Sequence, residues 1–125
     1  MNHSKMYFTD LCEGIQNKLF YRVKVENVSI ENSNYILQEE INNELEEMSI
    51  RNIEKYLIDF GFFKALEVCD ESYGLSALED MDKVHRIHCI LFCVIRDSFS
   101  LNDMEESYKK WCENGEGEGQ CETTN

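Results

Sequence analysis

The chain has 125 residues, of which 42% are hydrophobic and 30% charged, and its 25 acidic against 12 basic residues give a formal net charge of -13. This length fits one domain that can bury a modest core without disulfides or a metal ion. So acidic a surface disfavours direct binding to nucleic acid or to an anionic membrane, because both depend on Lys and Arg, and no apolar run approaches the roughly 20 residues of a membrane span.

The first residues and the cysteines indicate the compartment. The N-terminal sequence MNHSKMYFTD lacks the apolar core of a signal peptide, so we expect the protein to be intracellular, in the cytoplasm or nucleus. Six cysteines are many for this length, but they do not form the dense framework of a small secreted domain, and we expect most of them to be thiols. Cys112 and Cys121 flank a polar stretch, and whether either is reactive stays open.

A first helix is predicted to begin at Thr9 or Asp10. The chain has no proline, so glycines and capping residues mark its element boundaries. Asp10 and Glu13 have the spacing of a capping box. The apolar residues that follow at helical intervals are Leu11, Ile15 and Leu19.

The next stretch, FYRVKVENVSI, predicts a strand. Tyr21, Val23 and Val25 alternate with charged residues, which is the period-two pattern of a half-buried strand. A turn at residues 31–34 would return the chain and form a small β-hairpin near residues 20–37. The same turn could instead cap a helix that starts there, and we favour the helix.

Residues 35–48 predict an acidic amphipathic helix. Its apolar stripe consists of Leu37, Ile41, Leu45 and Met48. Its acidic face consists of Glu39, Glu40, Glu44, Glu46 and Glu47. Such a face is usually just solvated, but here it is also the most obvious surface for a basic partner.

Two capping-box spacings mark helices in the second half of the chain. Before these two caps, the apolar stripe of the preceding helix continues over residues 50–60 as far as Gly61. A short helix is predicted from there to Gly74. Ser76 with Glu79, and then Ser100 with Asp103, precede apolar stripes. The helices that these signals predict cover residues 77–99 and 101–111.

The predicted fold is therefore mainly α: a compact bundle of four to five helices, with the β-hairpin near residues 20–37 as an open variant. Residues 1–112 form a single helical domain. Residues 113–125, an acidic tail with three glycines, have almost nothing to bury and are predicted to be disordered.

The sequence HRIHCILFC, residues 85–93, raises the question of a metal site. His85 with Cys89, or Cys89 with Cys93, could give one ion two ligands from adjacent helical turns. A zinc shell needs further donors, and the possible ones are Cys69, Cys112 and His3. The paired-cysteine spacing of zinc knuckles is missing. The run is apolar enough to be a helix buried nearly all round, so we favour core packing, with no metal or other cofactor.

No motif for catalysis is present. The sequence contains no glycine-rich phosphate loop, no nucleophile elbow and no helical HExxH. Carboxylate pairs are uninformative in so acidic a chain. We therefore expect a protein that is not an enzyme.

The stretch IEKYLIDFGFFKALEVCDES, residues 53–72, resembles a LisH motif, the short helical dimerisation element of many adaptor subunits. The resemblance implies that two copies pack as a four-helix bundle, with Gly61 at the turn between the helices. Cys69 stands where the motif has an aromatic residue. The interface residues that the resemblance and the neighbouring aromatic cluster indicate are Ile53, Leu57, Phe60, Phe62, Phe63 and Leu66. A looser resemblance, to acidic histone-fold transcription subunits, rests on the order of a short helix, FTDLCEGI, before a long one.

The leading functional hypothesis is a small, non-catalytic interaction subunit that binds another protein or a second copy of itself. The first alternative is an acidic inhibitor or nucleic-acid mimic, of the kind that viruses use, which would bind a basic groove through its glutamates. The second is a metal or redox protein that uses His85, Cys89 and Cys93.

Overall fold

In the computed structural model, which describes residues 7–72, 74, 76–99 and 104–114, every element of the described residues is a helix. The mainly α prediction is confirmed, and the described residues alone form more helices than the four or five expected. The elements are α1 (Phe8–Glu26), a 3₁₀ turn η1 (Ile30–Asn32), α2 (Asn34–Glu46), α3 (Ile50–Phe60), α4 (Phe62–Ser72), α5 (Ser76–Glu79), α6 (Lys83–Ser98) and α7 (Met104–Glu113).

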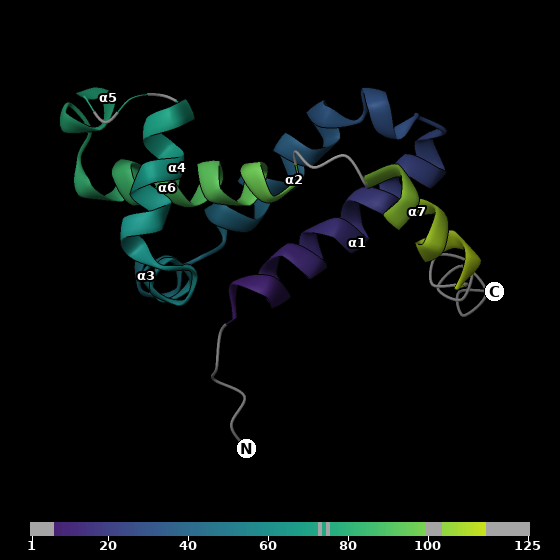
Figure 1. The fold of residues 1–125 in the computed structure, drawn as a ribbon, viewed down its shortest axis with the longest axis horizontal. Coiled ribbons are helices and arrows are strands. Elements are labelled where there is room, and N and C mark those ends of the chain that lie inside the picture. The colour runs from purple at the N-terminus through teal and green to yellow at the C-terminus, as the bar shows by residue number, and fades with distance from the viewer. Residues whose placement is uncertain (1–6, 73, 75, 100–103, 115–125) are drawn as a thin grey trace, which may run out of the picture.

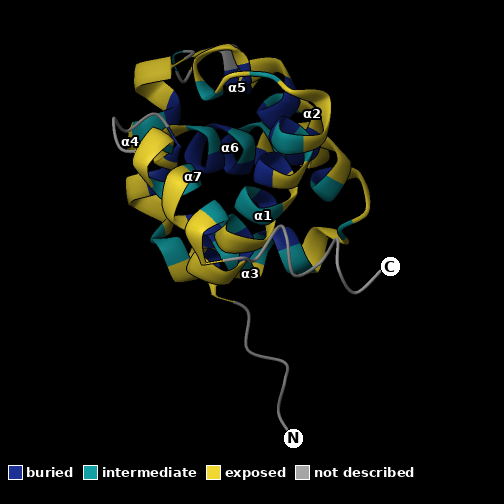
Figure 2. Ribbon diagram, turned by 90° about the vertical axis from the view of Figure 1, so that its right-hand side faces the viewer, coloured by how far each residue is buried: buried dark blue, intermediate teal, exposed yellow. Residues whose placement is uncertain are grey.

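Helix α6 lies at the centre of the fold. It packs against α2, α3 and α4, and α4 crosses it in Figure 1. Its buried residues include Ile90, Leu91, Val94 and Ile95. In Figure 2 much of the α6 ribbon has the colour of buried residues, whereas the outer helices are largely exposed. Helix α1 packs on α2 and α3. No helix in the described part of the chain is both long and apolar enough to cross a membrane.

The strand predicted after residue 20 is wrong, because α1 continues through it to Glu26. Phe20 and Val23 extend the buried stripe of the helix, whereas Tyr21 and Val25 are exposed. Burial of one helical face outweighs the weak β preference of the valines. The helix ends at Asn27 in the left-handed conformation (φ 57°), and the N–H of Val28 donates to the carbonyl of Val23 at 3.1 Å. No β-hairpin forms, since residues 34–37 begin α2.

Two short polar side chains begin new helices within apolar stripes that continue past them. The Ser49 hydroxyl accepts from the N–H of Asn52 at 3.2 Å and begins α3. The Asp82 carboxylate accepts from the N–H of His85 at 2.9 Å and begins α6, so the predicted helix 77–99 is two helices, α5 and α6. Asp82 has a lowered pKa, chiefly because of this hydrogen bond. Local caps therefore override the stripe.

Helix α7 lies beside the C-terminal half of α1 (Figure 1), held by aromatic rings. Phe20 of α1 meets Tyr108 and Trp111 edge-on, with ring centroids 5.2 and 5.8 Å away. The predicted cap formed by Ser100 and Asp103 lies outside the described residues. So does the predicted disordered tail, except for its first two residues, of which Glu113 ends α7.

The start of α1 is capped by another helix. Tyr7, at the N-cap position, makes no side-chain cap, but the N–H of Phe8 donates to Oδ2 of Asp59 in α3 at 2.7 Å. The Phe8 ring packs on Phe60, with centroids 4.8 Å apart. A carboxylate at this position satisfies an orphan N–H and complements the helix dipole.

We expect Asp59→Ala to lower the free energy of unfolding by about 1 kcal/mol, because it removes this cap. Urea denaturation followed by circular dichroism measures the change. Glu67→Ala, an exposed acid on α4, is the control and should change stability by less than about 0.5 kcal/mol. Equal losses in the two variants would show that the cap contributes nothing specific.

Candidate functional site: an apolar groove between three helices

A groove of about 710 Å³ lies between α3, α4 and α6. Apolar side chains from all three helices form most of it, and charged side chains stand at its edge. The lining residues are Glu54, Leu57, Ile58, Phe62, Leu66, Lys83, Arg86, Ile87 and Ile90.

Gly61 brings α3 and α4 together along one side of the groove. Its φ of 110° is unfavourable for other residues, and it lets α3 end at Phe60 and α4 begin at Phe62. The N–H of Gly61 still donates to the carbonyl of Leu57 at 2.9 Å. Ala65, fully buried, presents only a methyl group where α4 packs on the other helices. The turn thus places two of the three helices that line the groove next to each other.

The edge of the groove carries charges of both signs. The Lys83 ammonium lies 3.4 Å from the Glu54 carboxylate and links α6 to α3. The Arg86 guanidinium donates to the carbonyls of Leu78 and Met81 at 3.2 and 2.9 Å. These contacts fix the beginning of α6 against its neighbours.

Large apolar side chains are exposed beside the groove. Ile58 is 71% exposed, Phe62 42% and Phe63 83%. The rings of Phe62 and Phe63 meet edge to face, 6.2 Å apart. Single exposed apolar residues are common, but several that are contiguous with an apolar groove indicate a binding surface.

The residues predicted as an interface divide between core and surface. Ile53 and Leu57 are buried within the chain itself, and Phe60 is half-buried against Phe8. The others, Phe62, Phe63 and Leu66, lie on α4 at or beside the groove. Ile58 was missed, although an isoleucine outside the stripe of Ile53, Leu57 and Phe60 is a signal of apolar surface.

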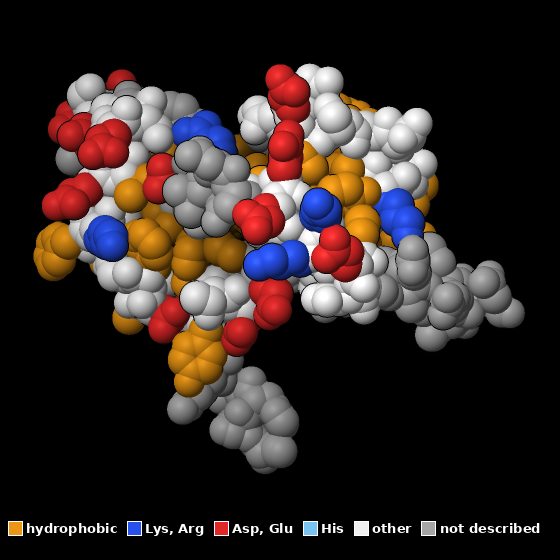
Figure 3. Space-filling view, turned by 45° about the vertical axis from the view of Figure 1, so that its right-hand side comes forward, with side chains coloured by type: hydrophobic (Ala, Val, Ile, Leu, Met, Phe, Trp, Pro, Cys, Tyr) orange, Lys and Arg blue, Asp and Glu red, His pale blue; other side chains and the backbone are white. Residues whose placement is uncertain are grey.

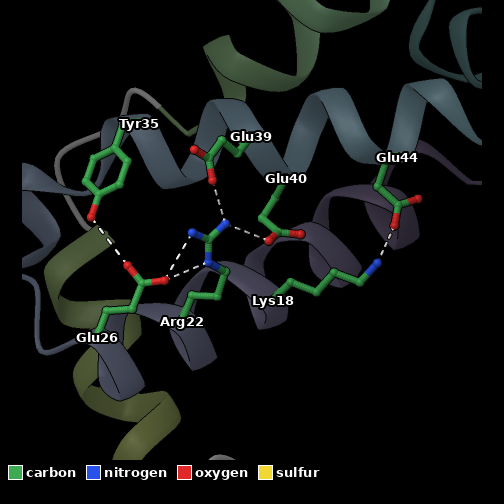
Figure 4. A network of polar contacts seen from close by, with 7 residues as sticks. All are labelled: Lys18, Arg22, Glu26, Tyr35, Glu39, Glu40 and Glu44. Carbon is green, nitrogen blue, oxygen red and sulfur yellow. Dashed lines mark hydrogen bonds and ion pairs between the residues drawn. The ribbon is translucent and has the colours of Figure 1, made fainter.

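The predicted acidic face is largely paired within the chain (Figure 4). The Arg22 guanidinium of α1 contacts the carboxylates of Glu26, Glu39 and Glu40 at 3.0, 2.9 and 3.1 Å. The Lys18 ammonium contacts Glu44, and this hydrogen bond raises the pKa of Lys18. Glu40 is buried, so α1 covers part of the face that sequence reasoning left open to a partner.

The remaining acids do not form one continuous surface in Figure 3. Glu46 and Glu47, at the end of α2, are exposed. On the face shown, Asp and Glu side chains are scattered, and Lys and Arg side chains lie between them. An extended phosphate-like array, as a nucleic-acid mimic needs, is not evident on this face.

Of the residues considered as metal ligands, His85 lies apart from Cys89 and Cys93. His85 lies at the start of α6, where its Nδ1 is 2.8 Å from Oδ1 of Asp82. Cys89 and Cys93 lie further along α6, and their sulfur atoms come together with that of Cys69 from α4. Burial is the main cause that raises the pKa of both the Cys89 and Cys93 thiols, and the neighbouring Cys69 contributes. His85 therefore lies outside the group of sulfurs.

Comparison with known proteins gives no relative from which to transfer a function. No known protein family, no curated protein and no solved structure matches the chain. The function is therefore inferred from the chain's own surfaces.

Proposed function

We propose that this chain is a small, non-catalytic interaction subunit that pairs with a second copy of itself through the α3–α4–α6 groove. The observation that carries the proposal is the position of Ile58, Phe62 and Phe63. Ile58 and Phe63 are highly exposed and Phe62 is partly exposed. Ile58 and Phe62 line the apolar groove, and Phe63 follows Phe62 on α4. Covering them removes apolar surface from water, at a gain of about 25 cal/mol per Å².

The surface has the complementarity that two-fold pairing needs. In a two-fold dimer the same patch meets itself, so it must provide both the projecting groups and the hollow that receives them. Ile58 and Phe63 project, and the groove lined by Leu57, Leu66 and Ile90 is the hollow. At the edge of the groove, Glu54 of one copy would pair with Lys83 of the other across the two-fold axis, in place of the pair within one chain.

The LisH-like resemblance of residues 53–72 points to the same segment. In that family two helical hairpins pair between chains, and here α3 and α4 form such a hairpin at Gly61. Because Ile53 and Leu57 are used in the chain's own core, the pairing residues shift to Ile58, Phe62, Phe63 and Leu66.

The test is solution mass by light scattering over a range of protein concentrations. The wild type should approach twice 14.7 kDa. Ile58→Asp and Phe63→Asp should remain folded and weaken the dimer about 30-fold or more, as for central interface residues that contribute about 2 kcal/mol. Val25→Asp, at a 60% exposed valine on α1, is the matched control and should dimerise normally.

Two results would overturn the proposal. One is a wild type that stays monomeric at the highest concentration reached. The other is a dimer that Val25→Asp dissociates as effectively as Ile58→Asp, which would place the contact elsewhere. Circular dichroism confirms in each case that the variant is folded.

A further inference from the structure

Three cysteine sulfurs meet in the interior between α4 and α6. The Sγ atoms of Cys69, Cys89 and Cys93 all lie within 4.8 Å of one another, and those of Cys69 and Cys93 are 3.5 Å apart. Cys69 and Cys93 are completely buried, whereas Cys89 is half-buried. Sulfur is not needed at two core positions and one adjoining half-buried position for packing alone, since Val or Ala would fill similar space.

We propose that Cys69, Cys89 and Cys93 bind a thiolate-preferring metal ion of the Zn²⁺ type. With Zn–S bonds of about 2.3 Å, the sulfurs of a tetrahedral site are roughly 3.8 Å apart. The Cys69–Cys93 separation of 3.5 Å is close to that value and no separation exceeds 4.8 Å, so small side-chain shifts suffice. Cys89 and Cys93 are one helical turn apart and can both reach one ion, and Cys69 supplies the third ligand from α4.

The chemistry of the donor set selects the class of ion. Thiolates favour zinc and other soft ions over Mg²⁺ or Ca²⁺, which prefer oxygen ligands. Binding replaces the thiol protons, which pass to solvent, with bonds to the metal, and it involves no oxidant. The proposal therefore requires only reduced protein and the ion.

The surface at Cys89 gives the ion an entry path. A hollow of about 370 Å³ reaches Cys89 between α2 and α6, lined by Asn42, Leu45, Glu46, His88, Cys89 and Phe92. A fourth coordination position on this side would be open to water or a small ligand, the arrangement of zinc sites with three protein ligands. The buried pair, Cys69 and Cys93, would form the closed side.

The ion would also join two helices of the interaction groove. Helix α4 carries Phe62 and Leu66, and α6 carries Ile87 and Ile90. Binding to the folded chain alone stabilises it by mass action. The metal site does not rest on the proposed dimer, because all three sulfurs belong to one chain.

The experiment titrates the reduced full-length chain with Co²⁺, a coloured substitute for Zn²⁺, and then displaces it with Zn²⁺. We expect one ion per chain, intense thiolate-to-cobalt charge-transfer absorption, and a rise in melting temperature with Zn²⁺. Cys89→Ala and Cys93→Ala should lower the affinity at least 100-fold. Cys112→Ala, which removes a half-buried cysteine outside the cluster, should bind normally.

The proposal fails if the charge-transfer absorption does not appear, or if it persists unchanged in both cluster variants. It also fails if mass spectrometry shows that Cys69 and Cys93 form a disulfide in air and the reduced chain takes up no ion. Cys89 is half-buried whereas Cys93 is fully buried, so Cys89→Ala is the milder change. If Cys93→Ala does not fold, Cys89→Ala still tests the site. Ile58→Asp should bind metal like the wild type, which separates this site from the dimer.

Discussion

Phe20→Ala is expected to lower the free energy of unfolding by about 3–5 kcal/mol, the usual cost of deleting a buried aromatic ring. Phe20 is 1% exposed and joins α1 to Tyr108 and Trp111 of α7. The substitution leaves a cavity and removes the ring on which α7 packs. Since domains of this size are stable by only about 5–15 kcal/mol, the loss is a large fraction of the total. Urea denaturation followed by far-ultraviolet circular dichroism measures it.

The neighbouring aromatic residue is the control for Phe20. Tyr21 lies on the outer side of α1 and is 41% exposed. Tyr21→Ala should therefore cost less than about 1 kcal/mol. A loss below 1 kcal/mol for Phe20→Ala, or equal losses at the two positions, would contradict the packing of α7 on α1.

Arg22→Met is expected to lower the free energy of unfolding by about 2 kcal/mol, between the cost of breaking an exposed and a buried ion pair. The substitution leaves the carboxylates of Glu26, Glu39 and Glu40 without their shared cation, and Glu40 is buried. Methionine keeps a long apolar side chain in place of the aliphatic part of Arg22, so the loss of stability reflects the missing charge more than lost packing. Thermal and urea denaturation at low and high salt measure it.

A second substitution tests how much of this loss in stability comes from leaving the buried carboxylate of Glu40 without a cation. Arg22→Met combined with Glu40→Met replaces the buried pair by two side chains of similar length and should recover at least half of the lost stability. Arg51→Ala, at an exposed position in α3, is the control and should be nearly neutral. If the double variant is less stable than Arg22→Met alone, the buried carboxylate is not the source of the penalty.

Helical periodicity predicted most of the fold because each long helix buries one stripe. Leu37, Ile41 and Leu45 follow that spacing in the sequence and are buried in α2. The error at residues 20–26 came from three alternating apolar residues, which fit a strand as well as a helix end. Packing of this part of α1 on α2, and of Phe20 on α7 more than 80 residues later in the chain, favours the helix.

The candidate sites were less predictable, because they depend on which helices meet. The spacing of Cys89 and Cys93 on one helix already indicated that both could bind the same ion. Whether His85 or Cys69 is the third ligand depends on how α4 crosses α6. In the same way, the glutamates of α2 suggested a free acidic face until Arg22 and Lys18 were placed opposite them. Long-range packing, and not composition, settles both cases.

Trp111 gives the chain an internal optical probe. It is the single tryptophan, and its buried indole Nε1–H has no hydrogen-bond partner among the described residues. An indole in such dry surroundings emits at short wavelength, and the emission shifts to the red when water reaches the ring. Release of α7 from α1 would therefore be seen as a colour change in fluorescence. Events at Phe62 or Cys89 would leave the emission unchanged as long as α7 stays in place.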